Sequence, residues 1–303
     1  MQLNRKSKAA ATSILSNTCL VLLKLFAGMI TGSVSLIAEA IHSTMDLAAA
    51  VVAFISVRVS DRPADKGHPF GHGKAENISG VIEGLLIFIA AGVIINEAIH
   101  KIIEGVHLEI IELGIVIMGV SIVVNVLVSR YLVKVSKATD SLALEADATH
   151  LTTDVITMTG VLIGLIVVKL TGLYILDPII AILVALLIIK AAFSITRKSF
   201  GGLIDSSLPD SEEERIKSCI RGHRDKVVSF HRLRTRKAGS QRQIDLHLVI
   251  PKMASVDEAH NMCDHLEMDI EKLLDNVEVN IHIEPCNIMC SQCMVICDLK
   301  KSE

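Results

Sequence analysis

The chain has 303 residues, of which 51% are hydrophobic and 21% are charged, and its mean hydropathy is +0.52. Soluble domains usually carry about a quarter charged residues, so the composition excludes an ordinary soluble protein. The formal net charge of -3 gives no reason to expect a nucleic-acid partner. Apolar residues are concentrated before Phe200 and charged residues after Asp205, which predicts a membrane part followed by a soluble part.

The membrane part contains six apolar stretches, and a bilayer core is crossed by about 20 helical residues. The expected spans are residues 11–31, 34–57, 78–99, 110–133, 142–170 and 173–193. The second and fifth are interrupted by His and Asp. The first follows a basic segment, and we interpret it as a retained helix, because it is long enough to span and further spans follow it.

The short loops between these spans differ in charge. Lys and Arg collect on the side of the N-terminus, the 2–3 loop, the 4–5 loop and the end of the sixth span, whereas the other side shows only Lys101 and Lys169. This asymmetry predicts a multi-pass protein of the inner or plasma membrane with both termini in the cytoplasm.

The soluble part is predicted to be a compact α/β domain with the element order αββαβ. Asp210 or Ser211 is expected to cap the first helix, and Ser255 with Glu258 forms a capping box for the second. Alternation predicts strands at 227–236, 243–250 and 277–284. The expected domains are 1–204 for transport, 205–285 for metal binding and dimerisation, and a Cys-rich tail at 286–303.

A motif is repeated in spans two and five, where His42 precedes Asp46 and His150 precedes Asp154 by four residues. Residues at this spacing share a helix face, so the two spans together offer a four-ligand N2O2 site that suits tetrahedral Zn2+. The alternative is that these groups merely hydrogen-bond helices together. A carboxylate at this depth costs about 2.5–3.5 kcal/mol on insertion scales, which favours the metal site.

These motifs, the histidine-rich loop at 62–76 and the small αββαβ domain resemble the cation diffusion facilitator family. Within it the chain is most similar to bacterial ferrous-iron/zinc exporters, through Leu233–Arg236 and Asp245–Leu248. The resemblance implies a homodimer of six-helix protomers that exports divalent metal, usually Zn2+, in exchange for protons. His42 stands where those exporters often have Asp, and in the family His is typical of zinc-selective members. Fe2+, Co2+ and Cd2+ remain alternatives.

The resemblance implies further sites. A regulatory site maps to the loop at Asp65, His68 and His72, where HxxxH near an Asp is itself a plausible ligand set. The alternative is a solvated loop in which the His residues are incidental. A cytosolic binuclear site maps to His231, His247, His260, His282 and Glu284, with Glu in place of the more familiar Asp. A charge interlock between protomers maps to Lys74, Asp205 and Arg236. Strand alternation independently places His247, and His282 with Glu284, on faces away from the core.

The tail contains Cys286, Cys290, Cys293 and Cys297, which the resemblance does not predict. Metal capture and an apolar helical stripe are equally open interpretations, and a cytosolic location argues against disulfides.

The predicted function is secondary transport, in which Zn2+ leaves the cytoplasm through the intramembrane site by proton antiport, with Glu39 and Asp147 helping at an acidic entrance. No Walker A motif is present, so nothing suggests ATP drive. An intramembrane metalloenzyme would need an open metal position, and no HExxH motif occurs. A membrane-anchored metal sensor would explain the cytosolic histidines but not the two HxxxD pairs.

Overall fold

The computed structural model describes residues 4–31, 34–104, 112–171, 175–223 and 227–287. The chain forms two compact units, Met1–Leu203 and Ile204–Glu303.

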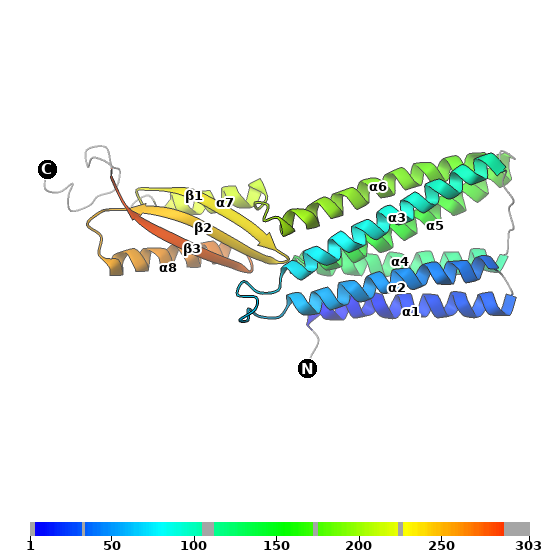
Figure 1. Ribbon diagram of the computed structural model, residues 1–303, viewed down its shortest axis with the longest axis horizontal. Helices are drawn as coiled ribbons and strands as arrows, with labels where there is room; N and C mark the ends of the chain where they lie inside the picture. The colour runs from blue at the N-terminus through cyan, green and yellow to red at the C-terminus, as the bar shows by residue number, and fades with distance from the viewer. Residues whose placement is uncertain (1–3, 32–33, 105–111, 172–174, 224–226, 288–303) are drawn as a thin grey trace. The chain divides into compact units, whose positions relative to one another are not determined.

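The described part of the first unit consists of long helices (Figure 1). They are α1 (Arg5–Thr31), α2 (Val34–Ser60), α3 (Lys74–Glu104), α4 (Glu112–Thr139), α5 (Leu142–Thr171) and α6 (Leu176–Leu203). α1 and α3 begin before the apolar stretch that predicts them, because polar and basic residues extend the helix beyond the hydrocarbon core.

Five of these helices are long and apolar enough to cross a membrane among the described residues: α1, α2, α3, α4 and α6. α5 has 30 residues and carries Glu145, Asp147 and Asp154 in its first half. α5 packs against α2, α3, α4 and α6, so its polar residues face other helices. This arrangement is typical of a helix that lines a polar pathway.

Close packing of α3 on α6 depends on two glycines. A Cβ atom at Gly80 would lie 2.1 Å from Ser199 Oγ, and one at Gly84 would lie 2.0 Å from Thr196 Oγ1. Both distances are shorter than a Cβ contact allows, so a larger residue at either position would force the Ser199 or Thr196 side chain to move, and glycine leaves room for this close approach.

A buried polar cluster around Glu76 fixes the ends of four helical segments. The Glu76 carboxylate is 0% exposed and lies 3.0 Å from the Lys6 ammonium of α1. It also accepts hydrogen bonds from Ser60, at the end of α2, and from Ser141, directly before α5. The first turn of α3 is therefore bound to α1, α2 and α5 at one end of the bundle.

The second unit has the predicted order αββαβ, here α7 (Asp210–Gly222), β1 (Ser229–Ala238), β2 (Gln241–Ile250), α8 (Val256–Leu273) and β3 (Val277–Pro285). The strand order is β1-β2-β3, with β2 antiparallel to β1 and parallel to β3. Both helices cover one face of this sheet (Figure 1). The core lies between these layers and includes Ile216, Ile220, Ile244, Leu246, Leu248, Leu266 and Ile270.

The helix starts in this unit agree with the sequence in one case and not in the other. The capping box of Ser255 and Glu258 is confirmed, with both reciprocal hydrogen bonds present. The predicted cap of α7 at Asp210 or Ser211 is wrong, because Pro209 occupies the N-cap position. A proline ring fixes φ near the helical value and needs no donor at a helix start, so the helix begins one residue earlier.

Candidate metal sites

The first site lies between α2 and α5 inside the helical unit. Nε2 of His150 is 3.2 Å from Oδ1 of Asp46, and one ligand atom each from Asp46, His150 and Asp154 lie within 4.8 Å of one another. Asp46 is only 8% exposed and His150 only 6%. The structure thus brings together three of the four residues predicted for the transport site. The side chain of the fourth, His42, lies outside the described residues.

The helical repeat explains this placement. His150 and Asp154 are one turn apart on α5, and α5 packs against α2, which carries Asp46. Nδ1 of His150 has no hydrogen-bond partner among the described residues. Two carboxylates and an imidazole in a dry environment are costly unless a cation or protons neutralise them, and nitrogen and carboxylate donors suit Zn2+ and other first-row divalent metals.

The second site is the loop between α2 and α3. Oδ1 of Asp65 accepts hydrogen bonds from the backbone N–H groups of Gly67 and His68, and these bonds hold the pKa of Asp65 below its usual value. Nδ1 of His68 and Nε2 of His72 each lie 3.4 Å from the Asp65 carboxylate. Gly71 has φ 79°, a left-handed conformation that favours glycine, and it turns the chain back toward Asp65. All three predicted loop ligands are therefore close together.

The third site lies on the sheet face opposite α7 and α8. His231, His247 and His282 are directly adjacent in the register of β1, β2 and β3. Their neighbouring ring centroids are 5.2 Å and 4.6 Å apart. Glu284 reaches across from β3, with its carboxylate 2.7 Å from Nδ1 of His247 and 3.4 Å from Nε2 of His231. The hydrogen bond from His247 is the main cause that lowers the pKa of Glu284.

A β-bulge that the sequence analysis missed orients His231. The register shifts between His231 and Arg234, and Arg232 has φ 51°. The extra residue lets His231 pair with His247 while Leu233 still packs against the core. The signal was present, because the alternation in β1 changes phase between His231 and Arg234.

His260 is not part of this sheet cluster. It lies on α8, its side chain is 72% exposed, and its Nδ1 is 3.5 Å from Asp264. Its predicted role as a ligand rests on the family resemblance alone. Of the tail cysteines, Cys286 is described as a free, half-buried thiol, whereas Cys290, Cys293 and Cys297 lie outside the described residues.

The three residues of the predicted interlock have partners within their own units. Nζ of Lys74 donates to the backbone carbonyl of Leu203, and Nη1 of Arg236 lies 3.3 Å from Asp205 Oδ2. A contact between two protomers is a separate matter, so the interlock stays a prediction.

Glu83 is a buried residue that the sequence analysis did not select. It lies on α3, is 0% exposed, and accepts a hydrogen bond of 3.1 Å from Ser79. An acid inside the apolar stretch 78–99 was the available signal. Asp147, predicted to help at an entrance, is likewise buried, at 1% exposure.

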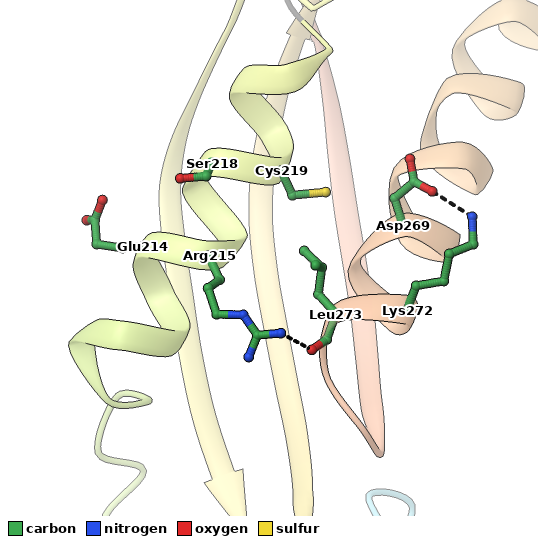
Figure 2. A pocket seen from close by; sticks show the side chains of 7 residues that line it. All are labelled: Glu214, Arg215, Ser218, Cys219, Asp269, Lys272 and Leu273. Atoms are coloured by element: carbon green, nitrogen blue, oxygen red, sulfur yellow. Dashed lines mark hydrogen bonds and ion pairs between the residues drawn. The ribbon is translucent and has the colours of Figure 1, made fainter.

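A surface pocket of about 670 Å³ lies between α7 and α8 and is lined by Glu214, Arg215, Ser218, Cys219, Asp269, Lys272 and Leu273 (Figure 2). Its charged groups are already engaged. Arg215 donates to the carbonyl of Leu273 at 2.6 Å, and Lys272 lies 2.8 Å from Asp269. Burial raises the pKa of the Cys219 thiol, which disfavours the thiolate that a metal would need. This pocket is therefore a poor metal site.

Comparison with known proteins places this architecture in a family. The model of the cation efflux transmembrane domain matches residues 10–204, and that of the cation efflux protein cytoplasmic domain matches residues 208–286. An uncharacterized transporter of Synechocystis sp. is 38% identical over 87% of this chain and 85% of its own length. The cation-efflux pump FieF of Escherichia fergusonii is 30% identical over 93% of this chain and 94% of its own length.

Among solved structures, the metal-bound C-terminal domain of the CzcD transporter from Thermotoga maritima is 25% identical and covers 26% of this chain and 92% of its own length, with a TM-score of 0.25. The family models together match nearly the whole of residues 10–286. The chain is a multi-pass membrane protein and belongs to the cation diffusion facilitator family of cation efflux transporters.

Proposed function

We propose that this protein exports Zn2+ from the cytoplasm in exchange for protons, through a tetrahedral site of His42, Asp46, His150 and Asp154. The observation that carries the proposal is that buried Asp46 and His150 meet half-buried Asp154 between α2 and α5. A structural polar contact would not require two acids and an imidazole at one point of a membrane helix pair.

The ligand types support zinc over other metals. Two imidazoles and two carboxylates form a closed tetrahedral set of borderline donors, whereas Mn2+ prefers oxygen-rich, six-coordinate sites. Fe2+, Co2+ and Cd2+ are the alternative substrates, and the relative named as a cation-efflux pump leaves the metal open.

Proton coupling follows from the chemistry of the ligands. His150 binds metal only as the neutral imidazole and the acids only as carboxylates, so metal binding releases protons and protons compete with metal. In an alternating-access cycle, Zn2+ loads from the cytoplasm and protons displace it on the outer side. No ATP is needed, because the proton gradient supplies the free energy.

Regulation is proposed to reside in the soluble unit. With both termini in the cytoplasm, the sheet cluster of His231, His247, His282 and Glu284 senses cytoplasmic metal. Exposed ligands on an open sheet face can be shared between two copies, and the chain is proposed to act as a homodimer. The loop ligands Asp65, His68 and His72 provide a further regulatory site.

The test is Zn2+ flux into proteoliposomes under an imposed pH gradient. The native chain is compared with Asp46→Ala and with Glu97→Ala, which removes an exposed carboxylate from α3. We expect flux that follows the proton gradient in the native chain and in Glu97→Ala and that is lost in Asp46→Ala. Tight Zn2+ binding without flux in the native chain would instead favour a membrane-anchored sensor. Fe2+, Co2+ and Cd2+ under the same gradient test the choice of metal.

A further inference from the structure

Glu83 and Asp147 form a pair of buried carboxylates outside the transport site. They lie on α3 and α5, and both side chains are inaccessible to solvent. Neither oxygen of Asp147 and only one oxygen of Glu83 makes a hydrogen bond of standard geometry among the described residues, although the Ser13 hydroxyl interacts with Asp147. Burying a carboxylate that accepts too few hydrogen bonds costs free energy. These oxygens therefore favour a bound ligand that the polypeptide does not itself supply.

The position of the pair follows from contacts along α3 and α5. At the start of both helices, Glu76 accepts a hydrogen bond of 2.7 Å from Ser141. One turn further on, a Cβ atom at Gly80 would lie 3.8 Å from Ala146 Cβ. One more turn along α3, Glu83 interacts electrostatically with Asp147 and His150. Asp147 thus lies one turn before His150 on α5, toward the predicted cytoplasmic end, and Glu83 of α3 lies near both residues.

The balance of buried charge favours a cation at this place. Around the two sites the described residues supply the carboxylates of Asp46, Glu83, Asp147 and Asp154. Among the described residues at these two sites, His150 supplies the basic group, and the ammonium of Lys24 on α1 is engaged by Ser43 Oγ at 2.8 Å. Ser13 of α1, whose hydroxyl interacts with Asp147, adds a buried hydroxyl oxygen.

We propose that Glu83 and Asp147 form a second intramembrane station that binds a divalent cation between the cytoplasm and the transport site. This inference deepens the proposed function and rests on it. The donors are all oxygens, which hold borderline metals such as Zn2+ less tightly than a site with imidazoles does. A weaker outer station and a tighter inner site are what passage requires, since each ion must be bound and then released.

The competing explanation is a structural pair of carboxyl groups that share a proton and never contact metal. The two explanations differ in what isosteric amides do. Glu83→Gln and Asp147→Asn keep the shape and remove the charge, so a structural pair would tolerate them with no change in bound metal. A cation station would lose its ion in either variant, and the double variant would be no worse than each single one, because the two groups act as a unit.

The test is a Mn2+ titration of the full chain in detergent, with free Mn2+ followed by electron paramagnetic resonance. Mn2+ is the probe because oxygen donors suit it. We expect Glu83→Gln and Asp147→Asn each to lose about one bound Mn2+ per protomer, the capacity of one carboxylate pair. The matched control Glu97→Gln, an exposed acid on the same helix, should bind as much as the native chain. Equal binding by all four proteins, each folded by size-exclusion chromatography, would overturn the station.

Zinc flux separates this inference from the proposed function. With the station present, Glu83→Gln and Asp147→Asn should reduce initial Zn2+ flux at low metal about 10-fold, a loss typical of removing one supporting carboxylate. If the native chain transports no Zn2+ but the variants still lose a Mn2+, the proposed function fails and the cation site stands. If the native chain transports Zn2+ and both variants bind and transport as it does, the station fails and the proposed function stands.

Discussion

The transport site and the sheet cluster use nearly the same ligands in opposite surroundings. In the first, the His150 imidazole and the Asp46 carboxylate lie 3.2 Å apart, and these residues are only 6% and 8% exposed. In the second, His247 and Glu284 are 2.7 Å apart, with side chains 20% and 35% exposed, and the neighbouring His282 is 64% exposed. The geometry alone would not separate them.

The difference in exposure determines what each cluster needs. Water and salt screen the charges on the sheet, so that cluster is stable whether or not a metal is bound. The buried site lacks this screening and must hold either a cation or protons at every stage. An exposed cluster is thus suited to respond to metal concentration, whereas a buried one is suited to exchange one positive charge for another. This contrast is the physical basis for assigning cargo to one and regulation to the other.

The largest effect is expected from Asp154→Asn in the buried site. It removes charge from the buried site while keeping volume, so we expect Zn2+ flux to fall at least about 100-fold, the upper range for altering a metal's surroundings. The metal-free protein should not lose stability, because one buried like charge has been removed. Flux in proteoliposomes and thermal unfolding in detergent measure the two effects. A destabilised protein with intact flux would contradict the assignment.

A smaller effect is expected from His247→Ala on the sheet. This variant removes the central imidazole, and we expect zinc affinity of the soluble unit to fall about 10-fold, while flux at saturating Zn2+ stays close to native. His265→Ala is the matched control, because His265 is an exposed histidine on α8 outside the cluster. Calorimetric zinc titration of both variants checks the result. An equal loss in the control would show that the sheet cluster is not the binding site.

The sequence predicts much of this arrangement because its motifs are local. The HxxxD pairs at His42 and His150 follow from helical periodicity, and the alternation around His247 and Glu284 follows from strand periodicity. Glu76 and Glu83 escape such reasoning, because neither has a repeated partner nearby in the sequence. Their importance depends on which helices pack against α3, and helix packing is a tertiary property that periodicity does not specify.

The predictions that differ from the structure also have local causes. α7 starts earlier than predicted because Pro209 fits the start of a helix without offering a side chain that could cap it. An unbroken strand through 227–236 does not predict the bulge at Arg232. The alternation of apolar and polar residues nevertheless changes phase on either side of it.

The pH dependence of zinc binding separates the contribution of the Glu284 carboxylate from that of the imidazoles in the sheet cluster. The hydrogen bond from His247 lowers the pKa of Glu284 below its usual 4.5, so its carboxylate is ionised throughout pH 5.5–7.5. Affinity lost on acidification in this range must come from imidazoles, which ordinarily titrate there. Glu284→Gln should weaken zinc binding to the sheet by the same factor at pH 5.5, 6.5 and 7.5. Zinc titrations at these values test this, and a deficit that vanishes at pH 5.5 would contradict a Glu284 carboxylate that binds zinc throughout this range.

The smallest effect is expected from the thiols beneath the helices of the soluble unit. Cys263 is 7% exposed, and burial raises its pKa to about 11, so at pH 7.5 almost none of it is the thiolate that binds metal or reacts with alkylating agents. Cys263→Ser should leave both zinc stoichiometry and iodoacetamide labelling of the folded protein unchanged. A loss of one zinc ion would place a soft ligand on the helix side of the sheet. The expected result instead excludes Cys263 as a ligand and agrees with metal binding on the open face of the sheet, where water can screen an unoccupied site.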